Sequence, residues 1–585
     1  MSDYNSCDRL LLNKAKAEHA INVRHCDLEG LAPSVRCALE LIFRQFAGLP
    51  FKLEHLSRAA AGRITPADLR AAVPGLLRRQ FVASACNTWG ERLYFIPQEL
   101  LSVLHQQWIR PRLEPKSGSD VKLIKEAKRG LALDVFRSLV WIASHGIPIT
   151  AKGFIHQRVL SKLSQQTALQ QEDVSGLSLK YSHQDIYPAH TVIILDLLLE
   201  LNILTESPKA WQLNVEGLSL WLRNNLAGMN SVLFQRMLLK YVPAEKEPQH
   251  FVYSLSSADW LVGEWYSYER FIGWLQEEGL LCPELPEERQ NWLWSWLEAM
   301  CGFGWLELGC DDAGEHAFRW IDLPLEWEVS QPRSEPDHHG QAGSCFYIQP
   351  DFEIMVPPDV PFDVRWELEA FSESIVTDRL SIYRITRESV AKGLRLGRSW
   401  QDMRLHLQRY SPGIPTNVII ALEEWGRQRS ESQGGSTFPR LADPSSLSGG
   451  QREVPLDEGI YRGMILGGEN MAAYRWNDAI PERKELFPGL EQVPGMWLKT
   501  ARSYHSSTAR QMVSQAIQWQ TLLALQIGGQ WVEYLPASLE DGEDWQVAGK
   551  LFASGDAEGY EAILAPEDWE AMRLLLPVID VAHQI

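Results

Sequence analysis

The first hundred residues change from a helical to a strand-like hydrophobic pattern in a definite order. Segments 31–46, 49–61 and 65–80 place apolar residues every three or four positions, as amphipathic helices do. Segment 81–97 instead alternates apolar and polar residues on either side of a polar turn, which indicates a β-hairpin. Three helices followed by a hairpin, or wing, are the pattern of a winged helix, and we expect such a domain within residues 1–110.

A looser copy of the same order follows. Helical patterns at 130–146, 149–163 and 190–204 precede a short apolar return, and they predict a second winged-helix-like domain over 111–220. Residues 221–329 are rich in tryptophan, and we expect a third helical or winged-helix-like domain there. An aromatic cluster can serve as a platform on which nucleobases stack, but such platforms lie in basic grooves. Because this region is rich in Glu and Asp, we expect its tryptophans to fill a hydrophobic core.

Two segments without apolar periodicity isolate the middle of the chain. Residues 330–344 and 429–456 are rich in Gly, Ser and Pro, which predicts linkers, and the second is long enough to be flexible. Between them, residues 345–428 begin with a strand-like run that Pro357-Pro358 should stop, and short helical patterns follow. This order predicts a small α/β domain with a helical tail.

Several spaced landmarks within this middle domain form a recognisable series. They are Gln349-Pro350-Asp351, Pro357-Pro358, the run from Ile385 through Thr386, Arg387 and Glu388 to Ser389, Ser411-Pro412, Ile414-Pro415 and Trp425. In this order they resemble the N-terminal helicase-associated domain of XPB-type DNA helicases, over about 80 of the 585 residues. The resemblance implies association with a helicase or with DNA processing, and it implies no catalytic residue.

The C-terminal region, residues 457–585, begins its regular pattern with a helix over 506–520 and continues with strand-like runs. Together with Pro536, Trp545 and Gly549, this order resembles a divergent WYL domain, which implies a small β-barrel. WYL domains are thought to sense ligands or nucleic acid, but this region lacks the basic residues that nucleic-acid sensing requires. A structural or partner-binding barrel is the safer expectation.

These observations together predict an α+β multidomain protein. We expect repeated winged-helix units, a small α/β helicase-associated domain, and a C-terminal small β-barrel-like domain.

Charge restricts where nucleic acid could bind. Residues 1–200 contain 25 Lys and Arg against 19 Asp and Glu, whereas the rest of the chain contains 31 against 56. Only the N-terminal third therefore offers phosphates a favourable field. Within it, basic residues surround the third predicted helix and the hairpin, and the candidate DNA contacts are Lys52, Arg58, Arg63, Arg70, Arg78, Arg79 and Arg92.

The middle domain carries the one locally basic stretch beyond residue 200. This second candidate contact surface consists of Arg384, Arg387, Lys392, Arg395 and Arg398. Asp351 and Glu353 could be paired carboxylates, but on a strand they share a face without a third ligand, so a solvated strand face is the better interpretation.

The sequence contains none of the local signatures of catalysis that we sought. A phosphate-binding loop of the form GxxxxGK[ST] is absent, as are GxSxG, HExxH and a GxGxxG after a strand. The eight cysteines show no CxxC spacing, and the pair His338-His339 lies in a predicted linker, so we expect no metal site and no cofactor. No apolar run reaches the length of a bilayer-spanning helix, and the N-terminus has no secretory pattern.

We therefore expect a cytoplasmic, bacterial, non-catalytic accessory protein in DNA processing or transcription regulation. Its expected partners are DNA, through the first winged helix, and a helicase or another protein. The alternative is a protein–protein scaffold that docks a separate helicase motor without touching DNA. A third interpretation, an unrecognised hydrolase, has no residue pattern behind it.

Overall fold

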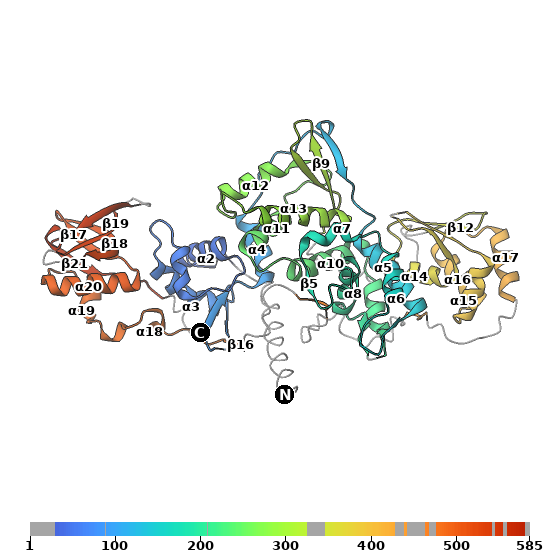
Figure 1. The fold of residues 1–585 in the computed structure, drawn as a ribbon, viewed down its shortest axis with the longest axis horizontal. Coiled ribbons are helices and arrows are strands. Elements are labelled where there is room, and N and C mark those ends of the chain that lie inside the picture. Colours follow the sequence, from blue (N-terminus) through green and yellow to red (C-terminus); the bar gives the residue numbers. More distant parts are fainter. Residues whose placement is uncertain are drawn as a thin grey trace.

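The computed structural model describes residue 28 and residues 30–87, 89–207, 209–324, 346–378, 380–427, 438–441, 463–466, 475–540, 545–553 and 559–579. The chain forms a row of units (Figure 1). The helices and strands of residues 346–427 lie at one end of this row, and the C-terminal unit lies at the other, beside α2 (Pro33–Phe46) and α3 (Pro66–Arg78). No described helix has both the length and the apolar character that crossing a membrane requires.

The N-terminal unit follows the predicted order of helices and hairpin. Its elements are α2, the 3-10 helix η1 (Leu53–Arg58), α3, β1 (Ala83–Cys86), β2 (Arg92–Phe95) and α4 (Gln98–Trp108). Apolar residues at helical spacing on α2, such as Leu39, Ile42 and Phe43, are buried in the core. The assignment of this unit to the winged-helix class stays a prediction.

The next part of the chain is mainly helical. Its elements are α5 (Leu131–His145), β4 (Ile147–Pro148), α6 (Gln157–Ser164), α7 (Gln171–Val174), η3 (Ser175–Leu177), β5 (Lys180–Tyr181), α8 (Ala189–Glu200), β6 (Leu204–Thr205), β7 (Ala210–Leu213) and α9 (Val215–Leu222). The strands β4, β7 and β6 form a small antiparallel sheet in that order. Helix α8 is mainly apolar and is buried on all sides from Ala189 to Leu199, which makes it the central helix of this part.

The tryptophan-rich part combines helices with an antiparallel sheet. Its elements are α10 (Leu226–Lys240), α11 (Lys246–Leu255), β8 (Tyr266–Ser267), α12 (Tyr268–Glu277), α13 (Glu287–Gly302), β9 (Leu306–Asp311) and β10 (His316–Trp320). An earlier segment, η2 (Gly118–Asp120) with β3 (Val121–Lys125), completes the sheet in the order β3-β9-β10-β8. The expectation that tryptophans fill a core is confirmed for Trp260, Trp265, Trp292, Trp296, Trp305 and Trp320, which are all buried. Trp327 lies outside the described residues.

Residues 346–427 form a four-stranded sheet with helices on one side (Figure 1). The elements are β11 (Tyr347–Ile348), β12 (Glu353–Val356), α14 (Phe362–Phe371), β13 (Glu373–Val376), β14 (Ser381–Arg384), α15 (Arg387–Arg395), α16 (Trp400–Tyr410) and α17 (Thr416–Arg427), and the strand order is β11-β12-β14-β13. Thr386 and Ser399 cap α15 and α16 by accepting hydrogen bonds from the backbone N–H groups of Ser389 and Asp402, and Ser and Thr are residues preferred at this position.

The C-terminal unit is an open sheet, and the prediction of a barrel is wrong for the described residues. Two short strands precede it in the chain and belong to other sheets, because β15 (Ile465–Leu466) pairs with β5 and β16 (Arg475–Trp476) pairs with β1. The elements of the unit are α18 (Arg483–Leu486), η6 (Leu490–Gln492), α19 (Gly495–Lys499), α20 (Ser506–Trp519), β17 (Leu523–Ile527), β18 (Gln530–Glu540), β19 (Gln546–Phe552), β20 (Tyr560–Leu564), η7 (Pro566–Asp568) and β21 (Ala571–Leu574). The sheet order is β20-β19-β18-β17-β21, so β20 and β21 stand at opposite edges. The chain passes from one edge to the other through η7, where Pro566 has no N–H to donate to a strand pairing. Among the described residues, no pairing between β20 and β21 closes the sheet.

The described residues form two hydrophobic cores. The larger one runs without interruption from the N-terminal unit through the central helices into the unit of residues 346–427. The second belongs to the C-terminal unit, and it includes Ala67 and Ala71 of α3. The protein is thus a mixed α+β, multidomain structure in which one N-terminal helix contributes to both cores.

Candidate nucleic-acid interface

Helix α3 has a capped N-terminus and contains a proline near its C-terminal end. The Thr65 side chain accepts a hydrogen bond from the Asp68 backbone N–H at 3.2 Å, and the Asp68 carboxylate accepts one from the Thr65 N–H at 2.8 Å. A proline inside a helix ordinarily kinks or shortens it, yet α3 continues past Pro74 to Arg78. Proline removes only one backbone donor there, and Pro74 lies on the side of the helix that meets the C-terminal unit.

The side of α3 opposite the large core is covered by the C-terminal unit. Ala67 and Ala71 pack into the second core, which also contains Phe487 of the segment after α18. Arg70, only 9% exposed, lies between them on this side of the helix. In a helix-turn-helix protein, the face of the recognition helix that points away from its own core contacts the bases. In this structure the equivalent face contacts protein.

Arg70 is held by the end of α20. Its guanidinium donates a hydrogen bond to the side-chain oxygen of Gln520 at 3.1 Å and another to the carbonyl oxygen of Trp519, and it lies over the Phe487 ring. Burial lowers the pKa of Arg70 from its ordinary value, because the charged form is removed from water. These contacts occupy the guanidinium, so it cannot neutralise a phosphate in this arrangement.

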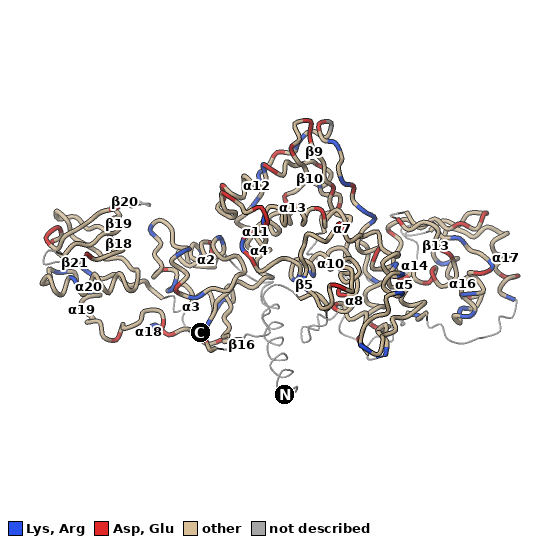
Figure 2. Tube along the Cα trace, viewed as in Figure 1, with Lys and Arg blue, Asp and Glu red and all other residues tan. Residues whose placement is uncertain are grey.

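Two other predicted contacts also bind the C-terminal part of the chain. Arg63 forms an ion pair with Glu533 of β18 at 2.6 Å. Arg92 on the hairpin donates to the carbonyl oxygen of Ala479 at 2.5 Å and lies 3.5 Å from the Glu485 carboxylate. Figure 2 shows basic and acidic positions interspersed where these two units meet, which fits charge pairing across the contact.

The hairpin is extended by a third strand from the same C-terminal part. β16 pairs antiparallel with β1, aligning Ala85 with Trp476, and the Ser84 hydroxyl donates to the carbonyl oxygen of Asn477 at 2.5 Å. The Trp476 ring packs against Phe95 with ring centroids 5.5 Å apart. The free edge that β1 would otherwise present is therefore occupied by the protein itself.

The described residues of the hairpin turn are exposed or half-buried, and Asn87 forms hydrogen bonds within the turn. The Asn87 side-chain oxygen accepts from the backbone N–H groups of Trp89 and Glu91, at 3.0 and 2.9 Å. Lys52, a predicted contact, forms an ion pair with Glu91 at 2.8 Å beneath this turn. The turn presents Trp89 with 87% of its surface exposed, a feature that the sequence interpretation missed because it treated the turn as polar.

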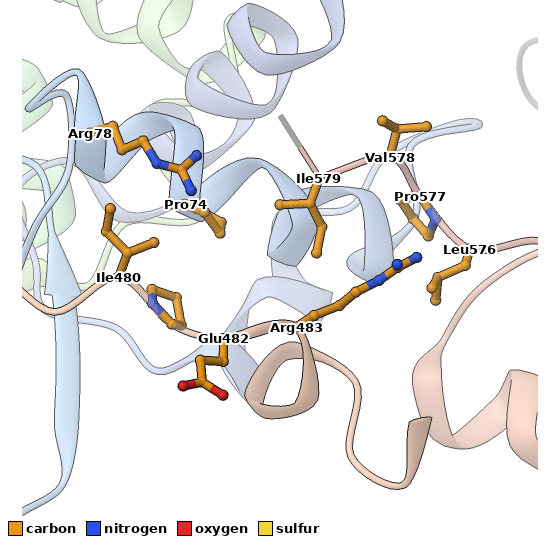
Figure 3. Close-up of a pocket in the computed structure, with 10 residues that line it drawn as sticks. Pro74, Arg78, Ile480, Glu482, Arg483, Leu576, Pro577, Val578 and Ile579 are labelled. Carbon is orange, nitrogen blue, oxygen red and sulfur yellow. The ribbon is translucent and has the colours of Figure 1, made fainter. Parts of the chain in front are cut away.

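The three remaining predicted contacts of this unit have different surroundings. Arg78 extends from α3 over a hollow of about 520 Å³ that residues 480–483 and 576–579 also line, and Glu482 points away from it (Figure 3). Arg79 donates to the carbonyl oxygen of Gly30 at 3.3 Å, whereas Arg58 is exposed at the end of η1. The seven residues therefore do not form one continuous basic face.

The second basic stretch is also divided by the fold. Arg384 forms an ion pair with Glu353 at 2.5 Å on the sheet, and the Lys392 ammonium turns inward to donate to the Glu369 carbonyl oxygen at 2.9 Å. Arg398 is buried, where it binds Glu367 at 3.2 Å and the carbonyl oxygen of Phe438 at 2.9 Å. Arg384, Arg387 and Arg395 are exposed, whereas Lys392 is half-buried and Arg398 is buried, so the five residues do not form one exposed basic surface.

A buried ion pair fastens the unit of residues 346–427 to the central helices. Arg137 of α5 binds the carboxylate of Glu369 on α14, and the rings of Phe136 and Phe362 meet edge to face with centroids 5.2 Å apart. Burial raises the pKa of Glu369, and the Arg137 charge opposes that rise. This contact was not predicted from the sequence, because both residues lie on ordinary helical patterns far apart in the chain.

The described residues contain no group of three or more His, Cys, Asp or Glu side chains arranged to hold a metal ion. The pair His338-His339 lies outside the described residues, as do the predicted linker 330–344 and most of 429–456. Among the cysteines that the structure describes, Cys37, Cys86, Cys282, Cys301 and Cys310 are free thiols.

Comparison with known proteins gives a family-model match in the middle of the chain. Residues 346–449 match the family model described as "Helicase conserved C-terminal domain". This match ties the middle unit to helicase-associated domains and covers about a fifth of the chain. No curated protein matches the chain.

Proposed function

We propose that this protein is a non-catalytic accessory protein of a helicase or a related DNA-processing machine, and that it acts mainly as an adaptor. The observation that carries the proposal is the helicase-related unit of residues 346–449 in a sequence without a phosphate-binding loop. We further propose that this unit is of the XPB-associated type, on the landmarks from Gln349 to Trp425. The C-terminal unit is a divergent, open relative of the WYL domain in this proposal.

The attachment of the helicase-related unit supports an adaptor role. The buried pair of Arg137 and Glu369 and the packing of Phe136 on Phe362 fix this unit to a large helical body through α14. Separation of a buried ion pair is costly, because it leaves a charge without its partner, so this pair opposes separation of α5 and α14. The unit of residues 346–427 would therefore present its remaining faces to a partner in a fixed orientation.

The covered face of α3 also favours the adaptor over direct reading of a duplex. Arg63, Arg70 and Arg92 each bind atoms of the C-terminal part of the chain. Contact between α3 and a major groove therefore requires the C-terminal unit to leave. We propose that the winged-helix-like N-terminal unit serves chiefly as a docking site for the C-terminal unit.

Affinity purification of the tagged chain from its native host, with nuclease treatment, tests the adaptor role. We expect a motor ATPase to be recovered in near-stoichiometric amount whether or not nucleic acid is digested. Loss of the motor after nuclease treatment would show that DNA bridges the two proteins. Failure to recover any motor ATPase would reject the adaptor role.

A second candidate function is direct DNA contact by the N-terminal unit, favoured by its local excess of basic residues. Anisotropy titration of a labelled duplex with the full chain at low salt measures it. Replacement of Arg58 and Arg79 by Glu tests residues on the part of the unit away from the Arg70 contact, with Arg395→Glu as the control. Weaker binding by the double variant alone, with a lower salt slope, would favour DNA contact. Equal binding by all forms would reject it.

A further inference from the structure

The sheet of residues 346–427 has one face without helices. Side chains alternate along its strands, so Ile354, Val356 and Tyr383 point towards the helices and are buried. Met355 and Ile382, next to them in sequence, point to the opposite face and are half-buried. Figure 1 shows the helices of this unit on a single side of the sheet.

The strand register aligns four apolar side chains on that open face. Tyr347 is paired with Met355, Met355 with Ile382, and Ile382 with Val376, so one residue from each strand lies in a single row. Tyr347 is 55% exposed and Val376 is 41% exposed at the two ends of the row. The solvent face of an antiparallel sheet is ordinarily polar, and contiguous exposed apolar side chains mark sites of interaction.

The next row of the same face is charged. Arg384 stands between Glu353 and Glu373 on the neighbouring strands, and it is ion-paired with Glu353. Asp351 and Asp378 lie at the turns that lead into and out of these strands, and both are exposed. Among the described residues, the rim of the apolar row has four carboxylates and one guanidinium. Arg379, which follows Asp378 in the sequence, adds one positive charge, so the sum remains negative.

The exposed apolar residues on the C-terminal sheet do not form such a row. Tyr560 and Ile563 on β20 are 56% and 63% exposed. They lie three positions apart on one strand, so they point to opposite faces, and their partners across the ladder are Leu551 and Ala548. Exposure of single residues of this kind is ordinary, whereas the row on the middle unit crosses all four strands.

We infer that the open face of the β11-β12-β14-β13 sheet is a protein-docking surface, and that its partner is a basic amphipathic segment. The apolar row supplies contact area for apolar side chains, and the carboxylates of the rim complement flanking Lys and Arg. The same carboxylates repel nucleic-acid phosphates and anionic lipid headgroups. The inference does not depend on the proposed function, because it rests on register, exposure and charge alone.

Fluorescence anisotropy with the full chain and designed peptides tests the inference. The probe is an 18-residue helical peptide with leucine on one face and lysine on the other, and its counterpart carries glutamate in place of lysine. We expect the lysine peptide to bind at least about tenfold more tightly than the glutamate peptide, and to be weakened at least about tenfold by Tyr347→Ser with Ile382→Thr. The control pair, Tyr560→Ser with Ile563→Thr, should leave binding unchanged.

A second variant protects the test against a folding defect. Glu373→Gln keeps the oxygen that accepts a hydrogen bond from Thr386 but removes a rim charge, so it should weaken the lysine peptide alone. Equal binding of both peptides, or equal effects of the face and control pairs, would overturn the inference. Two other results would also overturn it. Concentration-dependent dimerisation that is abolished by Tyr347→Ser with Ile382→Thr would identify a second copy of the chain as the occupant. Tight binding of a single-stranded oligonucleotide that is weakened by the same two substitutions would identify nucleic acid.

Discussion

The Arg70 guanidinium on α3 and the Gln520 side chain at the end of α20 are hydrogen-bonded at 3.1 Å, although 450 residues of sequence separate them. Gln520 has a φ of +51°, and it ends α20 in the left-handed conformation. This turn brings both the Gln520 side chain and the preceding carbonyl group to Arg70. The helix expected to read DNA is thereby coupled to the attachment of the C-terminal unit.

Removal of the Arg70 side chain should loosen that attachment. Arg70→Ala deletes a charged donor from two hydrogen bonds and leaves the Trp519 carbonyl without this partner. Hydrogen bonds to charged groups contribute about 1.5–3 kcal/mol each. We expect faster amide hydrogen exchange in α20 and in segment 475–487, measured by mass spectrometry, with little change in α8. Arg58→Ala, at an exposed site of the same unit, is the control and should leave exchange in these segments unaltered.

Loss of Arg137 should destabilise the junction between α5 and α14. Arg137→Met leaves the Glu369 carboxylate buried without its cation, which costs about 3–5 kcal/mol in free energy of unfolding. The pKa of Glu369, already raised by burial, should rise further once the Arg137 charge is gone. Denaturant unfolding of Arg137→Met, Glu369→Gln and the double variant forms a cycle. If the double variant is no more stable than Arg137→Met, the interpretation of this pair is incorrect.

Local features of the fold were predictable from the sequence, because their causes are local. Thr65, Thr386 and Ser399 cap α3, α15 and α16, in line with the general preference for Ser and Thr at the start of a helix. The strand that Pro357-Pro358 was expected to stop ends at Val356. The core position of Trp305 and Trp320 also followed from their acidic surroundings in sequence, which argued against a nucleic-acid groove.

The burial and the intramolecular hydrogen bonds of the candidate DNA-contact residues were not predictable, because they depend on residues distant in sequence. Nothing near Arg70 indicates that Gln520 will bind it, and nothing near Arg398 indicates the Phe438 carbonyl. The inward turn of Lys392 likewise depends on α14 lying beside α15. The barrel was expected from the resemblance to a WYL domain, and neither that resemblance nor the order of the strands determines whether the edge strands β20 and β21 pair.

Two buried histidines should make the protein sensitive to acid. His105 and His250 lie with ring nitrogens 3.2 Å apart, and burial lowers the pKa of both, that of His250 to about 3, with Arg44 and Lys246 adding positive charge nearby. The unfolded chain binds protons at these residues below about pH 6.5, whereas the folded protein does not. Their contribution to stability is thus complete above that pH and is lost as the pH falls towards 3.

Unfolding at a series of pH values checks this dependence. We expect each histidine to reduce the free energy of unfolding by about 2 kcal/mol between pH 7 and pH 5. His250→Gln retains a side-chain donor for the Arg44 carbonyl but cannot titrate, so it should flatten the curve over this range. His145→Gln, at an exposed site, serves as the control and should keep the wild-type slope. An unchanged slope in His250→Gln would contradict the assignment.

The contact between β15 and α8 depends on a glycine. The Asp196 carboxylate on α8 accepts from the Lys240 ammonium at 2.7 Å and from the Ile465 backbone N–H at 2.8 Å, which holds β15 against the helix. A Cβ atom added at Gly463 would lie 1.9 Å from the Lys240 ammonium nitrogen and 2.4 Å from an Asp196 oxygen, so Gly463→Ala should displace this segment.

We expect Gly463→Ala to cost about 1–3 kcal/mol, as overpacking of a buried site does, and to accelerate amide exchange at Ile465 and Tyr181, which pair across β15 and β5. Gly495→Ala, at a helix start where an added Cβ would meet nothing within 4 Å, is the matched control and should leave exchange unchanged. Wild-type exchange at Ile465 in Gly463→Ala would show that the backbone at residue 463 accommodates a side chain, and that the Asp196 contact alone positions β15.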